Sequence, residues 1–241
     1  MNLVGNRGRV PGPSPSRDAP QRPSAAPSAI PLAVLDNREV GPGIFLLRIR
    51  RAWDFEPGQV LGLSLDPAVP ARLYSIASGI DEDFYEILYN RVQGGLLTPR
   101  LATLVRGETV TVSPPSGTFR GSAGPALWIA TGTGIAPFVS MARSRLAEDK
   151  LLLHGARGPE YFYQIEYFSA LLQERYVACC SRRGTGFGFQ GRVSDWIASR
   201  ESFPQDRPCL LCGSAEMVVG VRDLLLGKGL PFSSISGEIY F

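Results

Sequence analysis

Short apolar runs that alternate with polar positions fill the first part of the chain after residue 30. Turn residues such as Pro-Gly, Asp-Pro and Asp/Glu clusters separate these runs, which cover 44–49, 59–65, 72–77, 84–90 and 109–112. Regularly spaced short strands are typical of an antiparallel barrel or sandwich. One helical stretch, 98–104, interrupts them. The pattern predicts an antiparallel β-barrel domain over residues 29–122.

After Gly121 the pattern changes, because apolar runs now alternate with longer helical stretches. Strands are predicted at 127–130, 151–154, 176–180 and 209–212, and helices at 138–148, 161–174, 193–199 and 215–228. This alternation predicts a parallel sheet wound with helices, which binds ligands at the carboxyl ends of its strands. We therefore expect a two-domain β + α/β protein, with a Rossmann-like parallel-sheet domain over residues 123–241.

The chain of 241 residues is 44% hydrophobic and 20% charged, which suffices for one large or two small domains. Its apolar runs fall far short of the roughly 18 residues that a transmembrane helix needs. The first residues have no hydrophobic region of the kind that a secretory signal carries. We therefore expect a soluble, cytoplasmic protein without a membrane span.

The formal net charge of +3 raises the possibility of a nucleic-acid partner. Residues 1–28 hold four arginines against the single Asp18, so this segment accounts for the whole excess and the rest of the chain is neutral. Proline, arginine and serine dominate the segment, which predicts a disordered, dispensable tail. A transit peptide is the alternative, although the prolines oppose an amphipathic helix. We expect no nucleic-acid partner.

The four cysteines are Cys179, Cys180, Cys209 and Cys212, and His154 is the single histidine. A disulfide-rich protein would spread more cysteines over a shorter chain. The CxxC at 209–212 has no second pair and no histidine pair to complete a zinc site. We therefore expect reduced thiols and no metal.

The tetrapeptide Arg72-Leu73-Tyr74-Ser75 ends a predicted barrel strand, which places Arg72 and Tyr74 on one face and Ser75 on the other. Read alone, it could be an exposed arginine beside a core tyrosine. Gly58-Gln59 precedes it, and its other companions follow in order: Gly94–Thr98, Pro115–Phe119, Ala130–Pro137, His154–Arg157, Ser181-Arg182, Gly191-Arg192, Cys212–Met217 and Glu238–Phe241. Together, over nearly all of residues 30–241, they resemble the ferredoxin-NADP+ reductase family in its bacterial, FAD-containing form.

The glycines at 94 and 95 let backbone N–H groups approach an anion, and Thr98 begins a helix whose positive end favours phosphate. A simple helix start would explain them equally well. The resemblance implies instead that they hold the FAD pyrophosphate with Arg72, that Tyr74 packs on the flavin and that Ser75 bonds near flavin N5. The FAD residues that it implies are Arg72, Leu73, Tyr74, Ser75, Gly94, Gly95, Leu96, Leu97, Thr98, Tyr240 and Phe241.

The Gly132-Thr133-Gly134 turn follows a strand and opens a helix, with Pro137 in place of the third glycine of a dehydrogenase fingerprint. Arg182, Arg183 and Arg192 follow the third strand, where cations could bind a 2′-phosphate; alternatively, Arg182 and Arg183 could be solvated loop charges. The resemblance favours NADP(H). The residues that it implies are Thr131, Gly132, Thr133, Gly134, Arg157, Ser181, Arg182, Arg192, Cys212, Gly213, Glu216 and Met217.

The resemblance also implies a hydride-transfer site made of Ser75, Cys212, Glu238 and Tyr240. From its position alone, Cys212 could be a small buried hydrophobic residue. Tyr240 and Phe241 end the chain, and terminal aromatic residues need a surface to pack on. In the family, the tyrosine covers one flavin face, and a further aromatic residue lies over the FAD adenine.

These implications predict an FAD-dependent oxidoreductase that exchanges hydride with NADP(H) and single electrons with ferredoxin or flavodoxin, bound transiently by a monomer. The alternative is a flavin reductase or an oxygenase reductase component of the same fold. A non-catalytic redox-sensing flavoprotein is a third reading, which the hydride-transfer residues disfavour.

Overall fold

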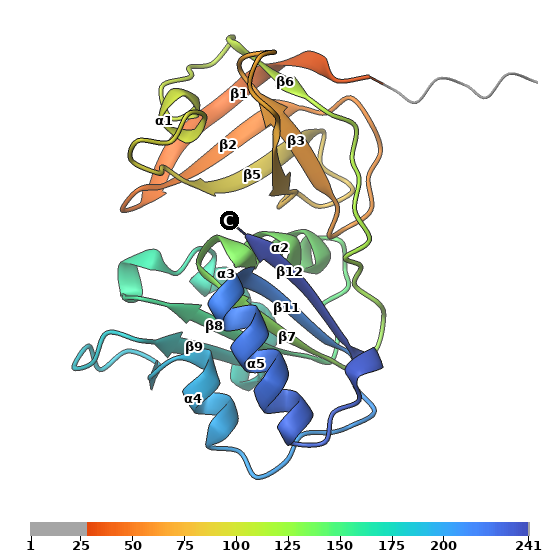
Figure 1. Ribbon diagram of the computed structural model, residues 1–241, viewed down its shortest axis with the longest axis vertical. Coiled ribbons are helices and arrows are strands. Elements are labelled where there is room, and N and C mark those ends of the chain that lie inside the picture. The colour runs from red at the N-terminus through yellow and green to blue at the C-terminus, as the bar shows by residue number, and fades with distance from the viewer. Residues whose placement is uncertain (1–27, 241) are drawn as a thin grey trace, which may run out of the picture.

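The protein consists of an antiparallel sheet stacked on a parallel sheet with helices, as Figure 1 shows. The computed structural model describes residues 28–240, so the tail predicted over residues 1–28 lies almost wholly outside the described residues, as does Phe241. The first half contains β1 (Ile30–Gly41), β2 (Ile44–Arg50), β3 (Val60–Ser64), β4 (Arg72–Ser75), β5 (Phe84–Asn90), α1 (Thr98–Leu101) and β6 (Thr109–Val112).

The antiparallel sheet has the strand order β4-β3-β6-β1-β2-β5 and closes on itself. Closure occurs just after β4, where Ile76 forms an isolated bridge with Ile87 of β5, and Ala77 N donates a 2.7 Å hydrogen bond to Glu86 O. The inward positions of β5 are Tyr85, Ile87 and Tyr89, all buried in the barrel core. The outward positions of this strand, which include Glu86 and Leu88, therefore face the second half of the molecule.

The long first strand β1 is absent from the strands expected from the sequence. It pairs with both β2 and β6, and its register shifts near Val34 and near Gly41. Its middle, Asp36-Asn37-Arg38-Glu39, is polar, so it has no apolar alternation to mark it. The pairing of β1 with two apolar neighbours stabilises the strand without that pattern.

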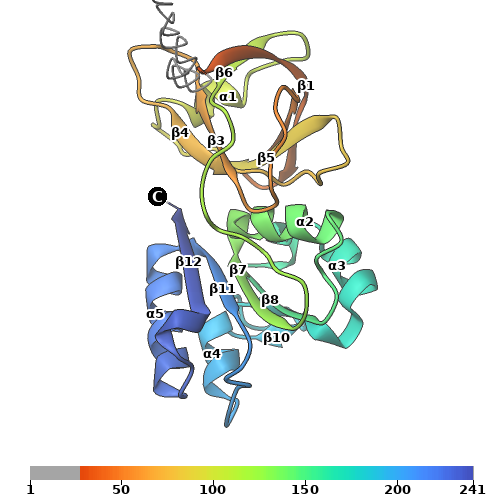
Figure 2. The ribbon, with the colours of Figure 1, turned by 90° about the vertical axis from the view of Figure 1, so that its right-hand side faces the viewer.

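The second half contains β7 (Ala126–Thr131), α2 (Ala136–Arg143), β8 (Lys150–Ala156), α3 (Ile165–Leu172), β9 (Tyr176–Cys180), β10 (Phe189–Gln190), α4 (Val193–Ala198), β11 (Cys209–Ser214), α5 (Ala215–Gly227) and β12 (Ile235–Tyr240). Its parallel sheet has the order β10-β9-β8-β7-β11-β12. Figure 2 shows α2 and α3 on one face and α4 and α5 on the other. The predicted fold class is therefore confirmed.

Two buried clusters hold this second sheet. The cluster on the α4 and α5 face includes Trp196 and Val221, and the one on the other face includes Phe138 and Phe168. The second cluster continues into the barrel through Leu46 and Leu88. The contact between the two sheets is thus an extension of one apolar core.

The helix predicted over 161–174 is wrong at its start, because α3 begins only at Ile165. Gln164 has a left-handed φ of 60°, and Phe162 is extended, so the chain cannot be helical there. Tyr163 instead reaches the barrel, and Phe162 packs on His154 with ring centroids 4.9 Å apart. Tertiary contacts therefore override the local helical pattern in this segment.

Helix α2 also differs from the predicted 138–148, since it runs from Ala136 to Arg143. Arg145 takes a φ of 65°, and Leu146 N bonds to Met141 O at 2.9 Å, a pairing that ends helices through a left-handed residue. The terminal strand β12 was not expected as a strand. It pairs in parallel with β11 along its whole length.

All four cysteines are free and buried. Within residues 28–240 no three or more His, Cys, Asp or Glu side chains come together as a possible metal site. The described helices include none with the length and apolarity needed to cross a membrane.

Candidate active site

The contact between the barrel and the parallel sheet joins three of the predicted catalytic side chains. Ser75, which is 2% exposed at the end of β4, donates a 2.7 Å hydrogen bond to Glu238 Oε1 on β12. The Tyr240 hydroxyl, two residues further on, donates to Ser75 Oγ. Ser75 therefore forms one hydrogen-bonded row with Glu238 and Tyr240, which lie 163 and 165 positions further along the chain.

Cys212 lies beside this row. It faces Glu238 in the parallel register of β11 and β12, and its thiol lies against the Tyr240 hydroxyl. Burial raises the pKa of the Cys212 thiol, so it is uncharged at neutral pH. Cys212 can therefore act by its size and contacts, but does not supply a thiolate.

Burial also raises the pKa of Glu238, although the hydrogen bond from Ser75 opposes the shift. A carboxyl group with a raised pKa can hold a proton closer to neutral pH than an exposed one. Its neighbours Ser75 and Tyr240 carry hydroxyls that can relay a proton. The row is thus suited to binding a group that gains or loses a proton.

The glycine-rich turn after β7 packs against the end of β11. A Cβ atom on Gly134 would lie 2.2 Å from Cys212 O, and one on Gly213 would lie 2.2 Å from Thr131 Oγ1. Only glycine leaves room for the Cys212 backbone at position 134 and for the Thr131 side chain at position 213. Thr133, on the same turn, accepts a 3.4 Å hydrogen bond from Asn90 Nδ2 of the barrel. The predicted nicotinamide-side turn is therefore held beside Cys212.

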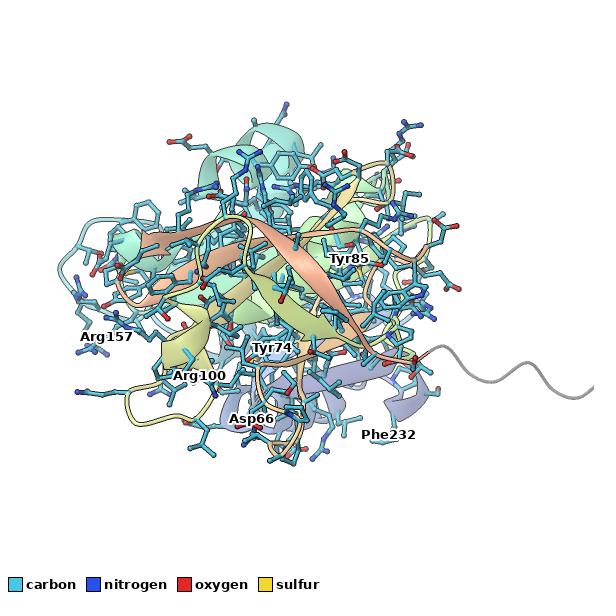
Figure 3. The ribbon with its side chains drawn as sticks, turned by 90° about the horizontal axis from the view of Figure 1, so that it is seen from above. Asp66, Tyr74, Tyr85, Arg100, Arg157 and Phe232 are labelled. Atoms are coloured by element: carbon cyan, nitrogen blue, oxygen red, sulfur yellow. The ribbon has the colours of Figure 1, made fainter. Side chains whose placement is uncertain are left out.

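Arg72, which is predicted to bind the FAD pyrophosphate, lies at the opposite end of β4 from Ser75. The loop before Arg72 and the segment around Leu96 line one shallow hollow, together with Asp66 and Arg100, which Figure 3 labels near Tyr74. The Thr98 hydroxyl accepts a 2.9 Å hydrogen bond from Val92 N and so closes the Gly94-Gly95 loop. Thr98 is the first residue of α1, as predicted.

These residues fit the shape and polarity of FAD. Leu73 is 65% exposed and Leu96 is 74% exposed, although both are apolar, and Leu97 beneath them is buried. Tyr74 packs edge-on against Tyr89, and burial raises its pKa to about 12, so its ring is neutral. An uncovered apolar strip next to the cationic Arg72 suits a flat ring joined to a pyrophosphate.

The arginines predicted to bind NADP(H), Arg182 and Arg192 at the 2′-phosphate and Arg157 beside the adenosine phosphates, follow neighbouring strands of the parallel sheet. Arg157 comes after β8, Arg182 after β9 and Arg192 after β10, and the strand order places these three ends together. Arg182 Nη2 lies 2.6 Å from Glu160 Oε1, and Arg192 Nη1 lies 2.8 Å from Glu216 Oε1. Both arginines therefore already have an exposed carboxylate partner.

The remaining predicted dinucleotide residues take mainly backbone roles. Ser181 N bonds to Ala156 O at 3.0 Å, which ties the loop after β9 to β8. Met217 N bonds to Ser214 Oγ at 3.3 Å, which caps α5. Gly132 has a φ of 55° and open space around it. Each position lies at the carboxyl edge of the sheet.

Four side chains at this site were not anticipated from the sequence. Glu160 pairs with Arg182, and Asn90 bonds to Thr133 across the interface. Glu86 and Tyr163 meet at the same interface, 2.9 Å apart. The one available signal was Glu86, a charged residue within the otherwise apolar Tyr85–Tyr89 segment.

An antiparallel barrel and a parallel α/β sheet that meet at a Ser-Glu-Cys-Tyr site define a flavin- and nicotinamide-dependent oxidoreductase class. Residues 128–223 match the oxidoreductase NAD-binding domain family. The chain is 34% identical over 214 residues to the ferredoxin–NADP reductase of Azotobacter vinelandii, with 76% of this chain and 83% of that protein covered. The protein belongs to the ferredoxin-NADP reductase family.

A further relative and a solved structure with the same fold add to this comparison. The reductase subunit of an aromatic O-demethylase from Amycolatopsis is 33% identical over 176 residues, with 67% of this chain and 50% of that protein covered. A ferredoxin NADP+ reductase structure from Neisseria gonorrhoeae, described with bound FAD and NADP, has a TM-score of 0.78 at 21% identity and covers 89% of this chain and 100% of its own. Relatives therefore include ferredoxin reductases, the reductase subunit of an O-demethylase and, at 28% identity, a reductase component of a terephthalate 1,2-dioxygenase from Comamonas.

Proposed function

We propose that the protein is an NADP(H)-dependent, FAD-containing reductase that passes electrons to ferredoxin or flavodoxin. The observation that carries this proposal is the hydrogen-bonded row of Tyr240, Ser75 and Glu238, which joins the barrel to the parallel sheet beside Cys212. A flavin ring bound along β4 of the barrel and a nicotinamide dinucleotide bound at the carboxyl edge of the parallel sheet would meet at this row. When bound, the two cofactors supply the redox chemistry, in which one hydride and then single electrons are exchanged.

The residues of the chain bind and orient the reactants. Arg72 and the Gly94–Thr98 loop hold a pyrophosphate, and Tyr74 packs on a flat ring from the barrel side. Thr131–Gly134 and Gly213 hold the nicotinamide half, while Cys212 limits its approach by contact. Tyr240, which covers Ser75 in the structure, must turn away for a nicotinamide ring to pack there. Glu238 accepts the hydrogen bond of Ser75 and so orients the Ser75 hydroxyl near the acceptor atom.

Arg182 and Arg192 select NADP(H) by binding the 2′-phosphate, with Arg157 beside them. A phosphate carries more charge than either carboxylate, so it can displace Glu160 and Glu216 from these exposed pairs. A site built for NAD(H) would instead present a free carboxylate to the ribose hydroxyls. Here both carboxylates are engaged by arginines.

The electron acceptor is a small acidic carrier. Arg91 and Arg100 are exposed on the barrel near the FAD residues, and such basic side chains guide an acidic partner into a small, transient interface. The Amycolatopsis relative supports a second candidate, in which the acceptor is an oxygenase component.

Steady-state assays with NADPH and three acceptors side by side test the proposal. We expect ferredoxin or flavodoxin to be reduced with the highest kcat/KM and free flavin to be a poor acceptor. Efficient reduction of free flavin alone would identify a flavin reductase. Failure with all three, alongside reduction of an oxygenase component, would support the second candidate.

A further inference from the structure

A buried carboxylate connects the two halves of the molecule. The Glu86 side chain, on β5 of the barrel, is fully buried and receives hydrogen bonds from three side chains. Arg48 Nε lies 2.9 Å from Oε2, Arg143 Nη1 lies 2.8 Å from Oε1, and the Tyr163 hydroxyl lies 2.9 Å from Oε1. The carboxylate is therefore fully paired despite its burial.

Two of these three donors come from the other half of the molecule. Arg143 ends α2, and Tyr163 lies in the turn before α3. Burial tends to lower the pKa of Arg143, but the charges of Glu86 and Glu82 more than offset this and raise it. Arg143 therefore stays charged in the interface. We use the name Glu86 clamp for Glu86, Arg143 and Tyr163.

The clamp acts on the helix that carries the nicotinamide-side turn. Glu86, Leu88 and Asn90 share the outward face of β5. Asn90 bonds to Thr133, just before the first turn of α2, and Glu86 bonds to Arg143 at the last. Leu88 belongs to the apolar cluster between these two contacts. Both ends of α2 are thus tied to one barrel strand.

Stability alone does not call for a charge at this place. Replacing a buried ion pair by packed apolar side chains is often neutral or stabilising, and the surrounding interface is already apolar through Leu46, Leu88 and Phe138. Apolar contacts have no preferred direction, whereas a paired carboxylate fixes the partner groups by distance and angle. The distinctive contribution of the clamp is therefore orientation.

We propose that the Glu86 clamp is a set of positioning residues for hydride transfer, an inference that rests on the proposed function. Through α2 it sets the position of Thr131–Gly134 relative to Ser75 on the barrel. Hydride transfer needs the two reacting atoms within a few tenths of an ångström of their contact geometry. Residues remote from the reacting atoms thereby control the rate without touching either cofactor.

The test uses the FAD-loaded protein with Arg143→Met and Tyr163→Phe. In anaerobic single-turnover experiments, we expect Arg143→Met to slow flavin reduction by NADPH about 10- to 100-fold, since a displacement near 1 Å can cost that much. Tyr163→Phe, which removes one hydroxyl, should slow it by about fivefold. Reduction by dithionite and the KM for NADPH should stay within about twofold of wild type, because neither depends on alignment across the interface.

A matched control is available at the same helix end. Arg145 Nη2 pairs with Asp81 Oδ2 at 3.2 Å across the same interface, but both side chains are exposed, so Arg145→Met should leave the NADPH rate unchanged. The proposal would be contradicted if NADPH reduced the flavin of Arg143→Met and Tyr163→Phe as fast as that of this control. It would also be contradicted if the rates of flavin reduction by NADPH and by dithionite fell together. A wild-type protein reduced by dithionite but not by NADPH would contradict the proposed function itself.

Discussion

Ser75 and Glu238 meet across the interface, with Ser75 Oγ donating to Glu238 Oε1 at 2.7 Å, although one ends a barrel strand and the other stands on the last strand of the parallel sheet. The bond exists only when the two sheets are stacked as they are here. It therefore links the reactivity of the site to the arrangement of the two halves.

Removing the Ser75 hydroxyl should slow flavin reduction by NADPH about 100-fold, because it removes the hydroxyl that we propose contacts the reacting ring and leaves Glu238 without its hydrogen-bond donor. FAD content should be unchanged, since Arg72 and the Gly94–Thr98 loop remain. Single-turnover absorbance measurements on Ser75→Ala check this. Ser140→Ala is the matched control, because Ser140 is also fully buried, and its hydroxyl has no partner among the described residues.

For Glu238, the two obvious substitutions should differ. Glu238→Gln keeps an oxygen that accepts from Ser75 and should retain most of the rate, whereas Glu238→Ala should lose about tenfold because Ser75 becomes free to rotate. Rates of flavin reduction by NADPH, measured for both variants, show whether Glu238 acts by orienting Ser75 or by supplying a carboxyl proton. Equal, large losses in both would show that the carboxyl group itself is required.

Charge removal at Arg182 or Arg192 should raise the KM for NADPH about 10- to 100-fold and the KM for NADH less than threefold, since charged hydrogen bonds to phosphate are lost only with NADPH. Arg183→Gln, on the same exposed loop, serves as the control. Steady-state kinetics with both nucleotides provide the measurement. Equal changes with NADPH and NADH would refute the assignment.

The carboxylates opposite these arginines should have the reverse effect. Glu160→Gln and Glu216→Gln free Arg182 and Arg192 from exposed ion pairs, so the KM for NADPH should fall by about two- to fivefold while that for NADH stays constant. The double variant should show the larger decrease. An unchanged or increased KM for NADPH would mean that these carboxylates do not compete with the 2′-phosphate.

The single histidine should make the fold sensitive to mild acid. Burial lowers the pKa of His154 to about 3, whereas the unfolded chain titrates near 6.5. The unfolded state therefore takes up a proton first, and stability that is present above pH 6.5 is lost as the pH falls towards 3. One proton accounts for about 2 kcal/mol between pH 7 and pH 5.

Urea unfolding at pH 7 and pH 5 tests this expectation. His154→Asn can still bond to Tyr176, which lies 3.0 Å from Nδ1 in the wild type, but it does not titrate, so its free energy of unfolding should change much less over this range. A variant with the same pH dependence as wild type would assign the effect to other groups.

Much of the fold followed from patterns in the sequence. The strands over 84–90, 109–112 and 176–180 coincide with β5, β6 and β9 because apolar alternation and β-branched residues mark them. The polar middle of β1 and the Gly-Glu of β12 carry no such mark, so these strands depend on their neighbours. The sequence of the segment before α3 predicts a helix, but Tyr163 donates a hydrogen bond to Glu86 across the interface, and the segment is not helical.

The individual residues of the site could be predicted from the sequence, but the hydrogen bonds and ion pairs between them could not. The family resemblance indicated Ser75, Cys212, Glu238 and Tyr240, and the structure brings these four residues together. The partners of Arg182 and Arg192 could not be foreseen, since any of several nearby carboxylates could have paired with them. The interdomain bonds of Glu86 depend on how two sheets dock, which no local pattern encodes.

The most direct test of the whole account is an anaerobic titration of the purified protein with NADPH, followed by absorbance. The account predicts that the protein carries FAD and that one equivalent of NADPH bleaches the flavin bands, with NADH much slower. Absence of bound flavin, or flavin bands that NADPH leaves unchanged while dithionite bleaches them, would contradict it.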